Sequence, residues 1–338
     1  MKLSTTNLRP GDFVEVRSPA EILPTLDADG ALDKLPFMPE MADFCGRSYK
    51  VSKRVVKTCY YGKSSGMRKF PAEDVVLLEG LRCSGAAHDG CQKACTIFWR
   101  EAWLRKIEGP SAIQPSVDSD SSKRLRARLK TATGPKTYFC QASEILNATS
   151  ELSRWERFGK SLSEVRAGNC GLLEMAQRIS IWLFWRGRRV FLGAYARRSQ
   201  TSTPVESLNL RSGEWIEIKP LASIAKTLNE KAHNRGLYFT PAMGRLCGEQ
   251  YRVESKIEKI IVDGTGEMRQ LRNTVFLKDS LCGCACVAFG GCPRGEFAYW
   301  REIWLSRVPV SGAPGCERLL AAEEKPVLIP EIAEQRSL

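Results

Sequence analysis

Four residues that could bind a metal lie close together in the first third of the chain. Cys83, His88, Cys91 and Cys95 fall within thirteen residues, and Cys45 lies upstream of them. Zinc prefers thiolate and imidazole ligands in a tetrahedral arrangement, and short loops with such spacing can present them. The sequence therefore predicts a metal site here, with zinc as the metal.

A second group of thiols lies near the C-terminus, and it could form a site made of cysteine alone. It consists of Cys247, Cys282, Cys284, Cys286 and Cys292. Other interpretations of the two groups are an iron–sulfur cluster, whose usual ligands are all cysteine, disulfides, or buried free thiols. The first ten residues lack the apolar core of a secretory signal, so we expect a cytoplasmic protein with reduced cysteines.

Both groups belong to a repeated stretch of sequence. The segment 11–17 returns as 213–219, a shift of 202 residues, and this shift places Cys45 on Cys247. The segment 99–104 (Trp-Arg-Glu-Ala-Trp-Leu) returns as 300–305 at a shift of 201. Two collinear blocks of this quality indicate an internal duplication.

The elements that must position these residues are short strands. Val14 and Val16 alternate with Phe13, Glu15 and Arg17, which is typical of a half-buried strand, and the repeat preserves the pattern. Further strands are predicted at 48–58, 75–81, 251–262 and 274–277, with a hairpin turn at Gly264–Gly266. Short strands with turn punctuation favour a small barrel in each copy.

We therefore predict an α+β protein with two small SH3-like β-barrel modules related by internal duplication. The expected units are an N-terminal module (8–108), a flexible basic linker (109–135), a mainly helical middle segment (136–200), a C-terminal module (205–308) and a peripheral tail (309–338). The piece 19–26 is expected to form a short helix or helical turn.

Several motifs resemble a family of uncharacterised bacterial proteins. They include Gly11-Asp-Phe-Val-Glu-Val-Arg-Ser, Leu35-Pro-Phe-Met-Pro-Glu-Met, the 82–95 segment that carries the metal candidates, Tyr138-Phe-Cys-Gln, Asn234-Arg-Gly-Leu, and Cys292-Pro-Arg with Tyr299-Trp-Arg-Glu-Ile-Trp-Leu. The likeness covers most of 8–308. The opening strand also resembles the first strand of SH3-like (KOW-type) barrels. The resemblance implies a duplicated cysteine-containing module and no particular activity.

The charge balance suggests an acidic partner. The net charge is +13, from 51 Lys and Arg against 38 Asp and Glu. Such a surface attracts nucleic acid or acidic proteins, although the charges can also be merely solvated. The candidate contacts are Arg54, Lys57, Arg124, Arg126, Arg128, Arg188 and Arg189. The most apolar run, 179–185, is cut off by arginines and is too short to cross a membrane.

Signatures of catalysis are weak by comparison. The chain has no Walker-type loop, nucleophile elbow or dinucleotide-binding glycine motif. Glu101 and Glu302 could serve as general bases, but their recurrence in both copies favours a structural ion pair or cap. The resulting hypothesis is a metal-stabilised tandem binding protein for nucleic acid or another acidic or protein partner. The alternative is a thiol- or metal-dependent enzyme or accessory protein in a bacterial biosynthetic pathway.

Overall fold

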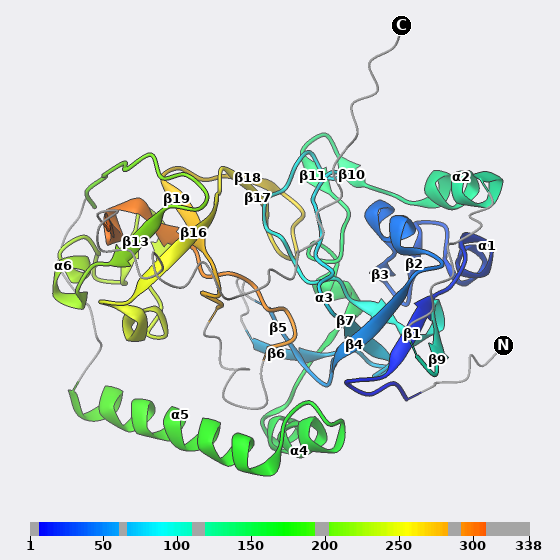
Figure 1. Ribbon diagram of the computed structural model, residues 1–338, viewed down its shortest axis with the longest axis horizontal. Coiled ribbons are helices and arrows are strands. Elements are labelled where there is room, and N and C mark those ends of the chain that lie inside the picture. Colours follow the sequence, from blue (N-terminus) through cyan, green and yellow to red (C-terminus); the bar gives the residue numbers. More distant parts are fainter. Residues whose placement is uncertain (1–6, 61–65, 110–118, 193–202, 283–291, 309–338) are drawn as a thin grey trace, which may run out of the picture.

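The computed structural model describes residues 7–60, 66–109, 119–192, 203–282 and 292–308. Figure 1 shows the strands of the two modules as separate groups, with helices α4 (Arg154–Arg166) and α5 (Leu172–Leu192) along one side of the molecule. None of the described helices combines the length and the apolar character that spanning a bilayer requires.

Each module is built on a five-stranded antiparallel sheet with the same strand order. In the N-terminal module the order is β8 (Trp99–Arg100), β7 (Val75–Leu78), β4 (Ser48–Arg54), β1 (Phe13–Val16) and β9 (Leu104–Ile107). In the C-terminal module it is β20 (Trp300–Arg301), β19 (Thr274–Leu277), β16 (Gln250–Lys256), β13 (Trp215–Ile218) and β21 (Leu305–Arg307). The predicted alternation is confirmed, because Val14 and Val16 are fully buried whereas Phe13 and Glu15 are partly exposed.

The predicted SH3-like barrels are wrong, because no closed barrel forms among the described residues. The edge strand β8 pairs only with β7, and the other edge, β9, pairs only with β1. Between these edges the chain makes a one-turn 3-10 helix, η3 (Glu101–Trp103), whose Trp103 is fully buried. No ladder pairing of described residues joins β8 to β9, so the sheet stays open. The described residues combine small antiparallel sheets with helices, as an α+β protein does.

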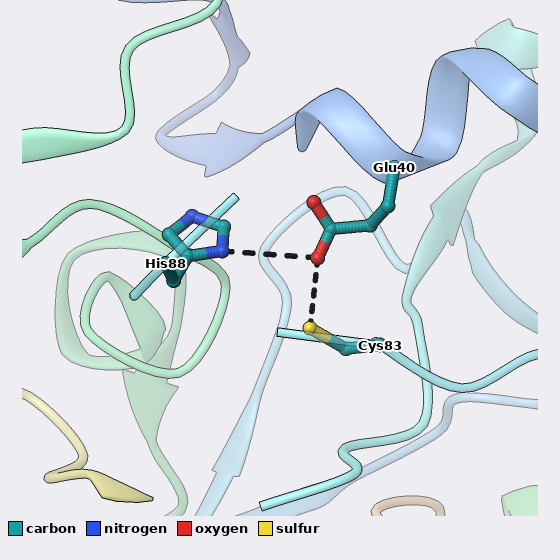
Figure 2. A group of neighbouring side chains, drawn as sticks. All are labelled: Glu40, Cys83 and His88. Carbon is teal, nitrogen blue, oxygen red and sulfur yellow. Dashed lines mark hydrogen bonds and ion pairs between the residues drawn. The ribbon is translucent and has the colours of Figure 1, made fainter. Parts of the chain in front are cut away.

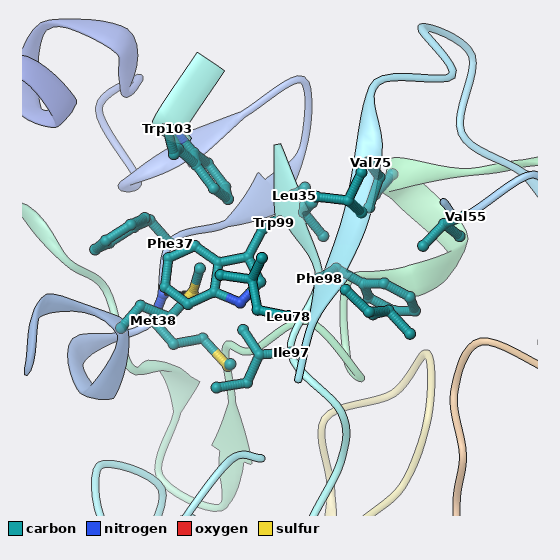
Figure 3. Packing of buried hydrophobic residues seen from close by; sticks show 14 of the residues in the cluster. Leu35, Phe37, Met38, Val55, Val75, Leu78, Ile97, Phe98, Trp99 and Trp103 are labelled. Atoms are coloured by element: carbon teal, nitrogen blue, oxygen red, sulfur yellow. Dashed lines mark hydrogen bonds between the residues drawn. The ribbon is translucent and has the colours of Figure 1, made fainter. Parts of the chain in front are cut away.

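Paired tryptophans form the centre of each core. In the N-terminal module Phe37 meets the faces of Trp99 and Trp103 edge-on, with ring centroids 6.2 and 5.2 Å apart (Figure 3). In the C-terminal module Phe239 packs on Trp304 in the same way, at 5.2 Å. Aromatic pairs in this geometry stabilise a core beyond the area that they bury. These tryptophans are therefore core residues, and they leave no stacking surface for a base.

Smaller hairpins and one three-stranded sheet accompany the two five-stranded sheets. Hairpins are formed by β2 (Ala31–Leu32) with β3 (Leu35–Pro36), β14 (His233–Asn234) with β15 (Leu237–Tyr238), β17 (Lys259–Ile261) with β18 (Met268–Gln270), and β10 (Ala132–Gly134) with β11 (Thr137–Tyr138); β5 (Thr58–Tyr60), β6 (Gly66–Lys69) and β12 (Ser150–Glu151) form a three-stranded sheet. The β17–β18 hairpin turns at Gly264–Gly266, as predicted. A Cβ at Gly266 would lie 2.4 Å from the Tyr138 carbonyl oxygen, so only glycine fits there.

The helices lie between and around the sheets. The remaining α-helices are α1 (Pro19–Ile22), α2 (Ser119–Arg128), α3 (Ile145–Ala148) and α6 (Leu221–Ala225), and short 3-10 helices are η1 (Leu23–Thr25), η2 (Pro39–Phe44), η4 (Met243–Leu246) and η5 (Glu302–Trp304). The short helix predicted at 19–26 is confirmed. Part of the predicted flexible linker is the ordered helix α2, because Leu125 is fully buried against the N-terminal module. The predicted tail lies outside the described residues.

Helix α4 is attached to the N-terminal module by a buried ion pair. Lys57 and Glu164 are both fully buried, and the ammonium donates to the carboxylate. The side-chain Nδ2 of Asn169 donates to the other carboxylate oxygen of Glu164. It also donates to the Arg54 carbonyl oxygen, at 2.8 Å. A buried charge without its partner is strongly destabilising, so each member of this pair depends on the other.

We predict that replacing Lys57 with Met lowers the free energy of unfolding by about 3–5 kcal/mol, because Glu164 is left buried and unpaired. Replacing both residues, in Lys57→Met/Glu164→Leu, should recover most of that loss. Urea denaturation of the three proteins measures it. The matched control is Lys50→Met, whose partner Glu79 is exposed, and its cost should stay below about 1 kcal/mol. Equal losses in the Lys57 and Lys50 variants would show that the buried pair has no special role.

Candidate metal centre

Three chain segments bring Glu40, Cys83 and His88 together. Glu40 lies in η2, and Cys83 follows β7, where its amide nitrogen donates to the Cys95 carbonyl oxygen at 2.8 Å. His88 sits in a tight loop in which the amides of His88 and Gly90 both donate to the Gly85 carbonyl oxygen at 3.0 Å. A Cβ at Gly85 would lie 1.9 Å from the Cys91 carbonyl oxygen, so the loop requires glycine at that position.

The three side chains point toward one another (Figure 2). The Cys83 thiol donates to Oε1 of Glu40 at 2.8 Å, and Nδ1 of His88 lies 3.7 Å from the same oxygen. One ligand atom from each residue lies within 4.8 Å of the other two, so the group could hold a metal ion. His88 is 1% exposed and Glu40 is 9% exposed, which places the centre inside the protein.

Hydrogen bonding prepares His88 as a ligand. Its Nε2 lies 3.0 Å from the Phe139 carbonyl oxygen, which can only accept a hydrogen bond, so Nε2 carries the hydrogen. Nδ1 then presents a lone pair toward Glu40, and it is buried without a hydrogen-bond partner. Oε2 of Glu40 is also buried and unpartnered. A backbone carbonyl that fixes the tautomer is the usual outer-shell partner of a metal-bound histidine.

Electrostatics at the centre favour the protonated thiol of Cys83, which donates to Glu40. Burial raises the pKa of the Cys83 thiol well above its ordinary value, and the negative charge of Glu40 raises it further. A thiolate beside a carboxylate in a buried site is costly, and a cation between them would remove the repulsion. The group could therefore hold a metal ion that displaces the thiol proton.

A small cavity adjoins Cys83 and His88. Its volume is about 20 Å³, which is room for one water molecule or one further ligand atom. Besides Cys83 and His88, three more thiols line it, those of Cys91, Cys95 and Cys140. The Ile261 amide donates to the Cys91 sulfur at 3.3 Å, and burial raises the pKa of Cys95 to about 12 and that of Cys140 to about 11.

Of the metal ligands predicted in the N-terminal module, the structure brings Cys83 and His88 into the three-residue group. Cys91 and Cys95 line the adjoining cavity. Cys45 lies instead in the hydrophobic core, where burial raises its pKa to about 12. Glu40 was missed, because a single carboxylate forty-three residues before its partner has no spacing signal in the sequence.

The C-terminal module does not repeat this group within the described residues. The register of β19 places Cys282 at the position of Cys83, but Ala242 stands where Glu40 does. Cys247 packs against the core. Cys292 lies 3.5 Å from Cys59 of the N-terminal module, sulfur to sulfur, in a small cluster that includes Cys282. Cys284 and Cys286 lie outside the described residues, and Cys83, Cys91, Cys95 and Cys247 are free thiols.

The basic residues predicted to contact an acidic partner are largely paired within the protein. Arg54 forms a 2.6 Å ion pair with Glu101, and Lys57 is the buried partner of Glu164. On α2, Arg124 pairs with Asp120, Arg126 pairs with Asp43, and Arg128 reaches the Asp27 carbonyl oxygen at 3.5 Å. The side chains of Arg188 and Arg189 lie outside the described residues.

The two candidate general bases have structural roles, as the repeat suggested. Glu101 accepts the amide of Leu8 at 2.8 Å in addition to the guanidinium of Arg54. Glu302 accepts the amides of Leu208 and Leu210 at 2.6 and 3.3 Å. Each glutamate therefore fastens the segment that enters its module, and neither lies in the Glu40–Cys83–His88 group.

A buried cluster of four charges joins the loop of the metal centre to the C-terminal module. Lys93 lies 2.5 Å from Asp263 and 3.2 Å from Glu296, and Arg294 lies 2.8 Å from Asp263 and also pairs with Glu296. All four residues are at most 8% exposed. Burial alone would raise the pKa of Asp263, but Arg294 and Lys93 outweigh it and lower this pKa from 3.8 to about 2.

Comparison with known proteins gives no match to a family model, to a curated protein or to a solved structure.

We predict that replacing Asp263 with Asn costs about 3 kcal/mol of stability at pH 7, because Lys93 and Arg294 then share one carboxylate. Since the pKa of Asp263 is lowered in the folded state, its contribution is present above pH 4 and is lost as the pH falls toward 2. The difference between wild type and the variant should therefore shrink by about 2 kcal/mol between pH 5 and pH 2. Urea denaturation at each pH measures it.

The matched control for this prediction is Asp29→Asn, whose carboxylate pairs with Lys130 on the surface. Its cost should stay below about 1 kcal/mol at neutral pH. A difference for Asp263→Asn that does not change with pH would contradict the prediction.

Proposed function

We propose that the protein is a zinc-stabilised binding protein, with Zn²⁺ held by Glu40, Cys83 and His88. The observation that supports this is the unpartnered, buried Nδ1 of His88, which faces a carboxylate and a thiol while its Nε2 donates to a backbone carbonyl. Thiolate, imidazole and carboxylate are the three protein ligands that zinc uses most. The cavity beside them has room for the fourth ligand, a water or a neighbouring thiolate.

The site is better suited to structure than to catalysis. Catalytic zinc keeps an open position that a substrate can reach, together with a nearby base. Here His88 and Cys91 are at most 8% exposed, and the adjoining cavity of about 20 Å³ is too small for a substrate. Because the ligands come from η2 and the loop after β7, the metal would hold these segments together, and the Phe139 carbonyl would connect them to the segment before α3.

An acidic partner is the second half of the proposal. It is supported by the net charge of +13 together with the distribution of counterions. In the N-terminal module, Arg54, Arg100 and Arg126 are each paired with a carboxylate. In the C-terminal module, cations at Arg235, Arg272 and Arg301 line a surface pocket. The partner would therefore bind to the C-terminal module.

We predict that protein purified without chelator contains about one zinc ion per chain from this site, and that His88→Asn and Glu40→Gln each weaken zinc binding at least about 100-fold, since even outer-shell changes cost 10- to 100-fold. Elemental analysis measures the zinc content. X-ray absorption at the zinc edge counts sulfur ligands: one sulfur indicates water in the fourth position, and two indicate a second thiolate.

The matched control is His233→Asn, the other histidine of the chain, which should leave the zinc content unchanged. Chelator should lower the melting temperature of wild type and of the control but not that of His88→Asn, because metal binding stabilises only the folded protein. Wild-type protein that neither contains zinc nor binds it after reconstitution would refute the zinc site.

A further inference from the structure

A pocket in the C-terminal module is lined by three arginines. Its volume is about 180 Å³, and it lies among the segment 204–206, the β14–β15 turn, the start of β19 and the strand β20. Arg301, on β20, is 8% exposed, whereas Arg235 and Arg272 are exposed. The other lining residues are Pro204, Val205, Glu206, Asn234, Asn273 and Ile303.

The N-terminal module has the same arginine but neutralises it. Arg100 on β8 is the counterpart of Arg301 on β20, because Arg100 is opposite Val75 and Arg301 is opposite Thr274 in equivalent strand pairs. Arg100 lies 2.6 Å from Asp74 and 3.3 Å from Asp33. Its Nη2 also donates to the Asp33 carbonyl oxygen at 3.2 Å. Two carboxylates thus balance the buried guanidinium.

In the C-terminal module both carboxylates have been replaced. The equivalent hairpin turn carries Arg235 in place of Asp33, and Asn273 stands in place of Asp74. The backbone contact is kept, since Nη2 of Arg301 donates to the Arg235 carbonyl oxygen at 3.0 Å. Nη1 donates to the Arg272 carbonyl oxygen and to the Thr274 hydroxyl, at 2.5 and 3.0 Å. Among the described residues, only neutral oxygens accept from this guanidinium.

The pocket consequently carries an excess of positive charge. Within the described part of the chain, no carboxylate pairs with Arg235, Arg272 or Arg301, and the one acid in the lining, Glu206, pairs with Lys219 at 3.0 Å. Burial and the nearby charge of Arg235 lower the pKa of Arg301, and its Nε is buried without a hydrogen-bond partner. The Nε of Arg100 is unpartnered as well, so it is the loss of the carboxylates that distinguishes the two modules.

We propose that this pocket binds the phosphate group of a small molecule, either as a phosphate monoester or as inorganic phosphate. Arginine presents planar, bidentate donors that match phosphate oxygens, and a bound dianion would supply the charge that Asp33 and Asp74 supply to Arg100. A terminal phosphate can reach the buried Arg301, whereas an internal phosphodiester carries chain on both sides and would stay at the exposed Arg235 and Arg272.

The remaining wall of the pocket fits the organic part of such a ligand. Pro204, Val205 and Ile303 are apolar and face the same space as the arginines. A volume of about 180 Å³ exceeds what a phosphate group alone requires, since a water molecule takes about 30 Å³. This inference rests on the acidic-partner half of the proposed function and is independent of zinc, because no residue of the metal centre lines the pocket.

The test is isothermal titration calorimetry of the full chain with inorganic phosphate and with glycerol phosphate at fixed ionic strength. Asn273→Asp gives Arg301 the carboxylate that Asp74 gives Arg100 in the N-terminal module, with almost no change in the shape of the side chain. It should weaken binding of both ligands at least about tenfold, since it gives Arg301 an internal acceptor and adds a repulsive charge. The same variant should melt at a higher temperature than wild type in phosphate-free buffer.

The matched control is Lys278→Gln, which removes one positive charge from an exposed position of the same module and should change affinity less than about twofold. Tighter binding of glycerol phosphate than of inorganic phosphate would identify a monoester as the ligand, and the reverse would identify the free ion. Zinc content measured on the same samples reports on the metal centre separately.

Three results would overturn the inference. The first is the absence of saturable binding of either phosphate by the wild type up to about 10 mM, and the second is an equal loss of affinity in Asn273→Asp and Lys278→Gln. The third is displacement of glycerol phosphate by an oligonucleotide without terminal phosphates, which would assign the pocket to a nucleic-acid backbone instead.

Discussion

The arrangement of the molecule depends on four charges that neither module could bury alone. Lys93 comes from the loop of the metal centre, Asp263 from the β17–β18 hairpin, and Arg294 and Glu296 from the strand-free segment before β20. Moving any one of them out of water is expensive, and the cost is offset only when all four are in place. The loop that carries His88 and Cys91 is therefore fixed by contacts to the other half of the chain. Lys93 and Arg294 occupy equivalent positions in the repeat, so the two modules meet through the same loop.

The repeated framework keeps its packing and changes its polar chemistry. The tryptophan pairs, the strand order and the buried glutamates that hold each entering segment recur in both modules. Glu40, by contrast, gives way to Ala242, and Asp33 gives way to Arg235. Apolar cores tolerate mainly volume-conserving change, so the packing recurs while the polar positions differ. Each module thus carries a polar site that the other does not.

Sequence patterns predicted the parts of the structure that depend on residue spacing and on turn residues. The alternation of Val14 and Val16, the glycine turn at Gly264–Gly266 and the helical turn after Pro19 all follow from spacing and turn residues. Whether a sheet closes depends on the pairing of its two edge strands, which the alternation pattern of the individual strands does not determine. Only part of the candidate metal centre could be predicted from the sequence. Cys83 and His88 are neighbours in sequence, whereas Glu40 and the Phe139 carbonyl reach them only through the tertiary fold. The ion pairs of Arg54 and Lys57 likewise depend on Glu101 and on Glu164 of α4, which lie far along the chain.

The β17–β18 hairpin has a consequence for how the chain assembles during synthesis. Ile261 belongs to the core of the N-terminal module, and the Gly266 carbonyl accepts the amide of Tyr138 at 2.8 Å. The core of the first hundred residues is therefore completed by a segment that the ribosome produces more than 150 residues later. Contacts of such long sequence separation slow folding, because the intervening chain must be ordered first. We therefore expect the N-terminal module to leave the ribosome with the place of Ile261 in its core unfilled, and to complete its packing only after the β17–β18 hairpin has been made.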